Sequence, residues 1–458
     1  MLFPRSGLLL IAVWLLVSGL WILQINTGVA DNGDFRRSSG WLLEKPVGFS
    51  SEIPPLGSPE RALRYHTLWH PYWEYRENVE NWPTVVTSFH LFLGVGYLAN
   101  QLAGLPHYSL IASGLVSRVL LFLILIGVGK VFFAKGWLVA SPLFLFILND
   151  SSYISYLNSL YQEHAAIILL PLLILSIGLA LKNPGGGYFF FATVTAFLFA
   201  QSKVQYFMTP ALLAAVLLLV HGCRKSRVKP LIALLLGVQL LALQAPLANE
   251  HSAHNSYNAL FSGALFFDQR YYPPWLEAEM RGCVGVPSWS REPNCFDRFQ
   301  GEVTWREVLD SYRHNPVSAI RGMDYGIRHL NRIDLNPPYS RQVREVVSLE
   351  SLVLVNVWSR VKGFASGWLV YPGIVFPLVI AWRCRKKDPV ITSVVLFLVA
   401  FTLSQVAVSV LGEGAVDLKK HLLLGNLALD LAAVIALLVL LRQISTQWRK
   451  GREYEIAR

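Results

Sequence analysis

Long apolar blocks, interrupted by short charged clusters, constrain this chain more than any other feature of its sequence. Hydrophobic residues make up 53% of the chain and charged residues only 15%. A helix needs about 20 apolar residues to cross the hydrocarbon core of a membrane, and such blocks are not typical of soluble globules. We therefore predict an all-α polytopic membrane protein with about ten transmembrane helices, at residues 8–25, 109–129, 136–148, 164–181, 188–200, 206–221, 230–247, 364–382, 390–410 and 421–441.

Basic clusters between the blocks determine the predicted topology. Lys and Arg are enriched in cytoplasmic loops, so we place residues 224–229, 383–387 and 449–452 in the cytoplasm, together with both termini. The first block is longer than the about 7 to 15 apolar residues of a signal peptide, and we expect it to remain as an anchor. The net charge of +11 then reflects membrane orientation, which favours membrane lipids over nucleic acid as partners.

Two stretches do not fit as single crossings. The apolar stretch 85–103 would invert the orientation of every later basic cluster, so we predict an interfacial or re-entrant helix on the outer side, and the same for residues 346–361. The predicted domains are residues 1–247, a transmembrane module with a first outer loop at 26–84; residues 248–363, an outer loop with an amphipathic helix; and residues 364–458, transmembrane helices with a basic cytoplasmic tail.

The four cysteines agree with this topology. Cys223 and Cys384 fall in cytoplasmic clusters, whereas Cys283 and Cys295 lie twelve residues apart in the large outer loop. Because disulfides persist in oxidising compartments, we predict a disulfide between Cys283 and Cys295.

Polar residues gather where the chain leaves the membrane on the predicted outer side. Asp31 and Asp34 follow the first block directly, although Asp31-Asn32-Gly33 is also typical of a turn. Further polar clusters with the same predicted location are residues 149–164, 201–205, 249–254 and 412–421. Each of them, taken alone, is also compatible with a solvated loop.

Lys203 is an exception, because a lysine in a short outer turn opposes the usual charge bias of membrane proteins. An anionic partner at the interface is therefore expected. Lys419, Lys420 and His421 provide a second set of cations near the same surface. Cations beside carboxylates predict a lipid phosphate held next to a general base.

Two charged residues lie inside predicted spans. Arg118 and Asp430 are each nine residues from the outer end of their block, so their depths are similar. Unpaired charges in the membrane are costly, and we predict that these two form a buried ion pair with a structural role.

Three short motifs, in order, carry a family resemblance. They are Asn32-Gly33-Asp34-Phe35, Tyr156-Leu157-Asn158-Ser159-Leu160-Tyr161-Gln162-Glu163 and Gly412-Glu413-Gly414-Ala415-Val416-Asp417-Leu418-Lys419-Lys420-His421. From about residue 8 to 441 the chain resembles the GT-C superfamily of integral-membrane glycosyltransferases, in particular a bacterial branch of glycan-biosynthesis hexosyltransferases. The segment 257–263 is weakly similar to the same branch. One departure is Leu160-Tyr161-Gln162-Glu163, where the branch has Phe-Tyr-Gly-Glu.

The resemblance implies a GT-C-like bundle in the bacterial cytoplasmic membrane, a sugar donor linked to a polyprenyl phosphate, and a glycan, lipid or protein acceptor on the outer face. It implies that Asp34 is the general base, with Asp31 as the second candidate. Asp150 and Glu163 would orient the acceptor or hold a divalent cation, the one cofactor that these carboxylates admit. The residues implied for phosphate binding are Lys203, Lys419, Lys420 and His421, and those implied for acceptor binding or support are Asn158, Tyr161, Glu413 and Asp417.

Two other classes of membrane protein remain open. A flippase or transporter for lipid-linked saccharides would carry polar residues along the interior of several helices, whereas here the polar clusters lie at helix ends. A polysaccharide polymerase or ligase of the outer face would also have many spans and a large outer loop rich in arginine.

Overall fold

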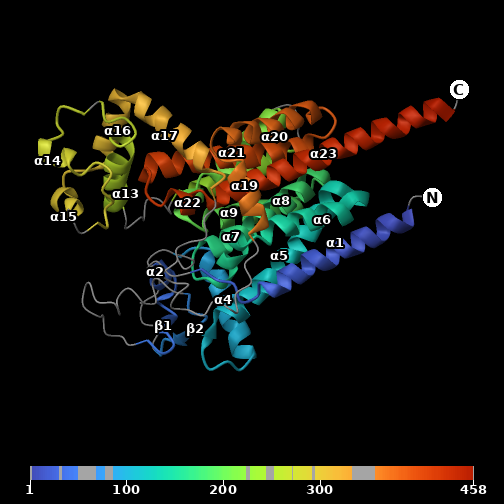
Figure 1. The fold of residues 1–458 in the computed structure, drawn as a ribbon, viewed down its shortest axis with the longest axis horizontal. Coiled ribbons are helices and arrows are strands. Elements are labelled where there is room, and N and C mark those ends of the chain that lie inside the picture. Colours follow the sequence, from blue (N-terminus) through green and yellow to red (C-terminus); the bar gives the residue numbers. More distant parts are fainter. Residues whose placement is uncertain are drawn as a thin grey trace.

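Helices dominate the structure, a computed structural model that describes residues 3–29, 34–49, 69–77, 86–222, 227–243, 252–270, 272–290, 294–332 and 356–456. The first and last long helices, α1 (Phe3–Leu23) and α23 (Leu423–Ile456), project toward the same end of the bundle, where both termini lie (Figure 1). The predicted all-α fold of a polytopic membrane protein is confirmed.

Six helical segments are long and apolar enough to cross a membrane. They comprise α5 (Leu110–Phe133), α8 (Glu163–Lys182), α10 (Thr209–His221) with the short helix η3 (Val204–Tyr206) before it, α20 (Val370–Cys384) with η7 (Gly367–Leu369) before it, α21 (Pro389–Glu413) and most of α23. A broken segment adds a seventh: α6 (Trp137–Leu148) is followed, after a bend of 67°, by α7 (Ser151–Ile154) and η2 (Ser155–Asn158). Shorter apolar helices are α1, α9 (Gly186–Ala200) and α11 (Lys229–Ala242). Each predicted block therefore contains a helix.

The centre of the bundle is formed by α8, α21 and α23. Helix α8 is apolar on nearly every side and packs between α5 and α9, as expected for a helix surrounded by protein rather than lipid. Helix α21 contacts α10, α20 and α23. By contrast, α1 exposes large apolar side chains such as Leu8, Leu15 and Ile22, which suit a lipid-facing surface.

A small sheet and a short helix lie beside the start of α5. Strands β1 (Leu43–Pro46), β2 (Tyr72–Tyr75) and β3 (Tyr108–Ser109) pair antiparallel in that order, a feature that the sequence did not predict. The predicted interfacial stretch 85–103 contains α4 (Phe89–Leu102). At about 1.5 Å per residue, its 14 residues are shorter than the roughly 30 Å hydrocarbon core of a bilayer.

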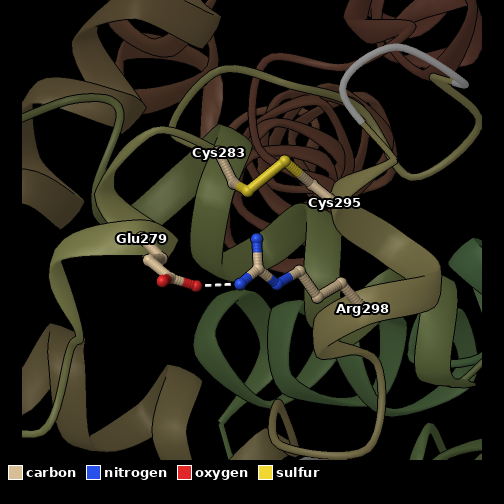
Figure 2. Close-up of a disulfide and its surroundings, with 4 residues drawn as sticks. All are labelled: Glu279, Cys283, Cys295 and Arg298. Atoms are coloured by element: carbon tan, nitrogen blue, oxygen red, sulfur yellow. Dashed lines mark hydrogen bonds and ion pairs between the residues drawn. A yellow bond between two sulfur atoms is a disulfide. The ribbon is translucent and has the colours of Figure 1, made fainter.

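A disulfide-bearing unit projects from the opposite end of the bundle to the termini (Figure 1). It contains α13 (Ser252–Ala259), the π-helix η4 (Leu260–Ala264), α14 (Ala278–Arg281), α15 (Cys295–Phe299), α16 (Trp305–His314) and α17 (Pro316–His329). The predicted disulfide between Cys283 and Cys295 is confirmed, and Glu279 pairs with Arg298 beside it (Figure 2). The unit has its own apolar core, which includes Tyr257 and Phe296. We name residues 252–329 the disulfide unit.

The predicted ion pair between Arg118 and Asp430 is wrong. Asp430 lies 2.9 Å from the ammonium of Lys362, and it accepts hydrogen bonds from Tyr153 at 2.7 Å and Trp358 at 2.8 Å. Arg118 instead donates to the carbonyl of Ile154 at 3.5 Å. Equal depth in the sequence does not determine which way a side chain faces around its helix, and this is why the prediction failed.

Lys362 belongs to α19 (Val357–Phe364), at the end of the stretch predicted to be a second interfacial helix. Residues 346–355 of that stretch lie outside the described residues. The described part is helical, and it packs through Lys362 and Trp358 against α23.

Candidate active site

Asp34 and Lys420, from the two ends of the chain, form an ion pair. Helix α2 (Asp34–Ser39) begins at Asp34, and the next residue, Phe35, is buried. The ring of Phe35 packs edge-on against Tyr161, with 4.8 Å between ring centroids, and also against Trp73. These ring contacts fix the start of α2, so that Asp34 is held against the short helix α22 (Leu418–His421), which carries Lys420.

Glu163 and Lys203 form a second ion pair, at 2.7 Å. Glu163 is the first residue of α8 and is almost fully buried, and Lys203 lies in the turn between α9 and α10. The positive end of the α8 dipole stabilises a carboxylate at this position. The anionic partner that the sequence predicted for Lys203 is thus, in this structure, a side chain of the protein itself.

A third pair lies within the link between α21 and α23, residues 413–421, which we name the 413–421 turn. The imidazole Nε2 of His421 lies 2.6 Å from a carboxylate oxygen of Glu413, the last residue of α21. The side-chain amide of Gln205 donates to Nδ1 of the same imidazole at 2.6 Å. Two left-handed residues, Gly414 and Asp417, let the chain reverse here.

Lys420 joins these pairs into one group. Its ammonium lies 4.4 Å from the centroid of the Tyr161 ring, a favourable cation–π contact. Burial lowers the pKa of Lys420, but the carboxylates of Asp34 and Glu163 more than offset this and hold the pKa above the ordinary lysine value. Lys420 is therefore a permanent cation at neutral pH. We call the combined set the charged cluster: Asp34, Glu163, Lys203, Glu413, Lys420 and His421.

The charged cluster combines carboxylates, ammonium groups and an imidazole at one place. A carboxylate can accept a proton from a hydroxyl group, and nearby ammonium groups can stabilise a phosphate that gains charge as it departs. Two surface hollows, of about 530 and 220 Å³, are lined by other residues, among them Tyr188 and His107. The members of the cluster contact one another in pairs, so a phosphate that enters the cluster displaces one of these contacts.

Asn158 and Tyr161, two of the predicted support residues, contact the segments that carry the site. The side-chain amide of Asn158 donates to the carbonyls of Ile25 and Thr27, at 2.7 and 2.9 Å, and so fixes the chain that leaves α1. Tyr161 lies between Phe35 and Lys420. Asp417, another predicted support residue, is exposed, and its carbonyl accepts from the backbone of Lys420 and His421.

The structure separates other predicted site residues from the charged cluster. Asp150 caps α7: its carboxylate accepts from Ser152 and from the backbone N–H of Ser359 at 2.8 Å. The resemblance implied that Asp150 orients the acceptor or holds a divalent cation, whereas in the structure its carboxylate is engaged in these helix contacts. Lys419 is exposed and lies near His329, outside the cluster. Asp31 lies outside the described residues.

The described part of the chain offers no group of three or more His, Cys, Asp or Glu side chains arranged to hold a metal ion. The carboxylates of Asp34, Glu163 and Glu413 each face a cationic or imidazole partner instead. In the described part of the chain, these carboxylates are therefore not arranged to bind the divalent cation that the resemblance allowed.

Gln205 is a site residue to which the sequence assigned no role. It lies in η3, two residues after Lys203, and it orients His421 through its side-chain amide. Its position in the polar segment 201–205 is the sequence feature that pointed to the site. Its partner, His421, lies in the distant 413–421 turn, so the sequence did not reveal the contact.

Comparisons with known proteins agree with this architecture. A family model described as the YfdI N-terminal transmembrane domain matches residues 4–270 and 287–458. No curated protein matches the chain.

Proposed function

Because the chain belongs to the YfdI N-terminal transmembrane domain family, and is a membrane glycosyltransferase-like protein, we propose that it is a GT-C-type hexosyltransferase. The proposed donor is a sugar linked to a polyprenyl phosphate. The proposed acceptor is a hydroxyl group of a glycan, lipid or protein at the outer face of the membrane.

The observation that carries this proposal is the ion pair between Asp34 and Lys420. It brings a carboxylate from the segment after α1 to a cation from the turn before α23, beside a second cation, Lys203. A base for a hydroxyl group and cations for a phosphate are the two requirements of transfer from a lipid phosphate.

In the proposed reaction, the acceptor oxygen forms a bond to the anomeric carbon of the donor sugar. The bond between that carbon and the phosphate oxygen breaks, and its electron pair leaves with the phosphate. Asp34 takes the proton of the acceptor hydroxyl, and Lys420 and Lys203 stabilise the departing phosphate. Both lysines are paired with carboxylates before the donor binds, so the donor phosphate draws Lys420 away from Asp34 and frees the base.

The proposed location of the reaction follows from the positive-inside rule. This rule places the described basic residues at the end of α20 and near the end of α23 on the cytoplasmic side of the membrane, together with both termini. The charged cluster lies at the ends of α9 and α21, which point the opposite way, so we place the site at the outer face of the bacterial inner membrane.

Substitution of the proposed base tests the function. Asp34→Asn removes the proton acceptor with little change in size, and we expect transfer to fall by about 10²- to 10⁴-fold. The measurement is turnover of purified protein with radiolabelled polyprenyl-phosphate hexoses and a membrane glycan extract as acceptor. The matched control is Asp297→Asn, the same substitution at an exposed residue of the disulfide unit; it should leave turnover unchanged.

Three outcomes would contradict the proposal. Turnover of Asp34→Asn equal to that of the control would remove Asp34 from the role of base. Movement of the lipid-linked sugar across vesicle membranes, without formation of a new glycosidic bond, would identify a flippase. Transfer of a preassembled polymer, but of no single hexose, would identify a polymerase or ligase.

A further inference from the structure

The segment Tyr257–Gly263 has no role in the proposed reaction, yet it contacts the turn that carries half of the charged cluster. The segment runs from α13 into the π-helix η4 of the disulfide unit. Glu413, Lys420 and His421 all belong to the 413–421 turn. π-Helices are rare and are found frequently at functional sites.

One backbone hydrogen bond joins the two segments. The N–H of Ala415 donates to the carbonyl of Ser262 at 2.8 Å. Within η4 the N–H of Leu265 reaches back five residues, to the carbonyl of Leu260. This wider register moves carbonyls off the regular helical ladder, so that the carbonyl of Ser262 accepts from the neighbouring turn.

Two glycines make this contact close. A Cβ atom on Gly414 would lie 2.2 Å from the carbonyl carbon and oxygen of Ser262, and the φ angle of Gly414 is +70°, which other residues rarely adopt. From the other side, a Cβ atom on Gly263 would lie 3.2 Å from Cα of Gly414 and 2.9 Å from the hydroxyl of Tyr312. Backbone therefore packs on backbone where the two segments meet.

Further hydrogen bonds link the surroundings of η4 to α21 and to α17. The hydroxyl of Tyr312 donates to the carbonyl of Val410 in α21 at 3.4 Å. The side chain of Ser318, in α17, donates to the carbonyl of Ala264 at the end of η4. The position of η4 is thus set by the disulfide unit and by α21 together.

We propose that Ser262, Gly263 and Gly414 form a joint that positions the 413–421 turn, and with it Lys420 and His421, for transfer. These are positioning residues, because they act through the cluster and not on the substrate. The inference rests on the proposed function for its effect on catalysis, but the joint itself is a structural claim. An error of about 1 Å in the placement of catalytic groups can lower a rate by about 10²-fold.

The test compares two glycines of one segment. Gly414→Ala introduces the clash and puts a Cβ atom at a φ angle of +70°, whereas Gly412→Ala, in the last turn of α21, places its methyl group more than 4 Å from every atom outside its own stretch of helix. We expect Gly414→Ala to lower kcat by about 10²-fold and to raise KM for the donor, with KM for the acceptor unchanged. Gly412→Ala should match the wild type. A merely less stable protein would lose active molecules without a change in the KM for the donor.

A second measurement does not need activity. Hydrogen–deuterium exchange of a peptide that contains Ala415 should be slow in the wild type and in Gly412→Ala, and at least tenfold faster in Gly414→Ala. If Gly414→Ala does not fold, Gly263→Ala replaces it: its methyl group meets the movable hydroxyl of Tyr312, so Gly263→Ala with Tyr312→Phe should recover part of the lost rate.

The outcomes separate the two proposals. Equal exchange and equal kinetics for Gly414→Ala and Gly412→Ala would overturn the joint and leave the proposed function intact. Absence of transfer in the wild type would overturn the proposed function, while the exchange rates would still decide whether the joint exists.

Discussion

Lys419 and Lys420 are neighbours in the chain, but only Lys420 reaches the charged cluster. Lys420 pairs with Asp34 and lies over the ring of Tyr161, whereas Lys419 is exposed. The sequence motif alone does not distinguish the two lysines, since both are cations directly before the last span. At the scale of single residues, the side-chain direction in a four-residue helix decides which lysine can act.

This difference predicts a contrast between matched variants. Lys420→Gln removes the cation that faces both Asp34 and the incoming phosphate, and we expect kcat to fall by about 10²-fold or more. Lys419→Gln should lose less activity than Lys420→Gln, because Lys419 is exposed and lies near His329, outside the charged cluster. Turnover at saturating donor measures both. Equal losses would show that the sequence motif, and not the observed geometry, describes the site.

At the scale of helices, α19 is held in place by buried charge. Lys362 lies 2.9 Å from Asp430 and donates to Asn426 at 3.0 Å, both on α23. Trp358 adds a hydrogen bond to the same carboxylate. Because the backbone N–H of Ser359 in α19 also donates to the carboxylate of Asp150, one short helix connects the bend after α6 to α23.

Loss of one partner should therefore cost more than loss of both. Lys362→Ala leaves the Asp430 carboxylate buried without its cation, and we expect the free energy of unfolding to fall by about 3 to 5 kcal/mol. The double variant Lys362→Met with Asp430→Leu should recover most of that stability. Thermal unfolding in detergent measures both variants. A double variant less stable than the single one would contradict this account of α19.

The elements themselves were largely predictable. Long apolar blocks dictate helices, because backbone polar groups in lipid must be satisfied within the segment, and each of the ten blocks contains a helix. The strands β1, β2 and β3 were not predictable, since they have only two to four residues each and pair across long gaps in the sequence. Pairings such as Asp430 with Lys362 depend on helix rotation, which periodicity does not reveal in helices that are apolar all round.

At the scale of the whole molecule, four distant segments converge at one end of the bundle. They are the start of α2, the start of α8 with the turn after α9, and the 413–421 turn. The sequence predicted a common face for these segments from topology, and the contacts of Asp34, Glu163 and Lys203 agree with it. The individual pairs, and the separation of Asp150 from them, required the structure.

The central claim is that this convergence forms the binding site for a donor phosphate. A cryo-electron microscopy map of the protein in lipid nanodiscs with added polyprenyl phosphate tests it most directly. We predict phosphate density about 3 Å from the ammonium groups of Lys420 and Lys203, with the pair between Lys420 and Asp34 broken. Phosphate density elsewhere, with that pair still intact, would contradict the claim.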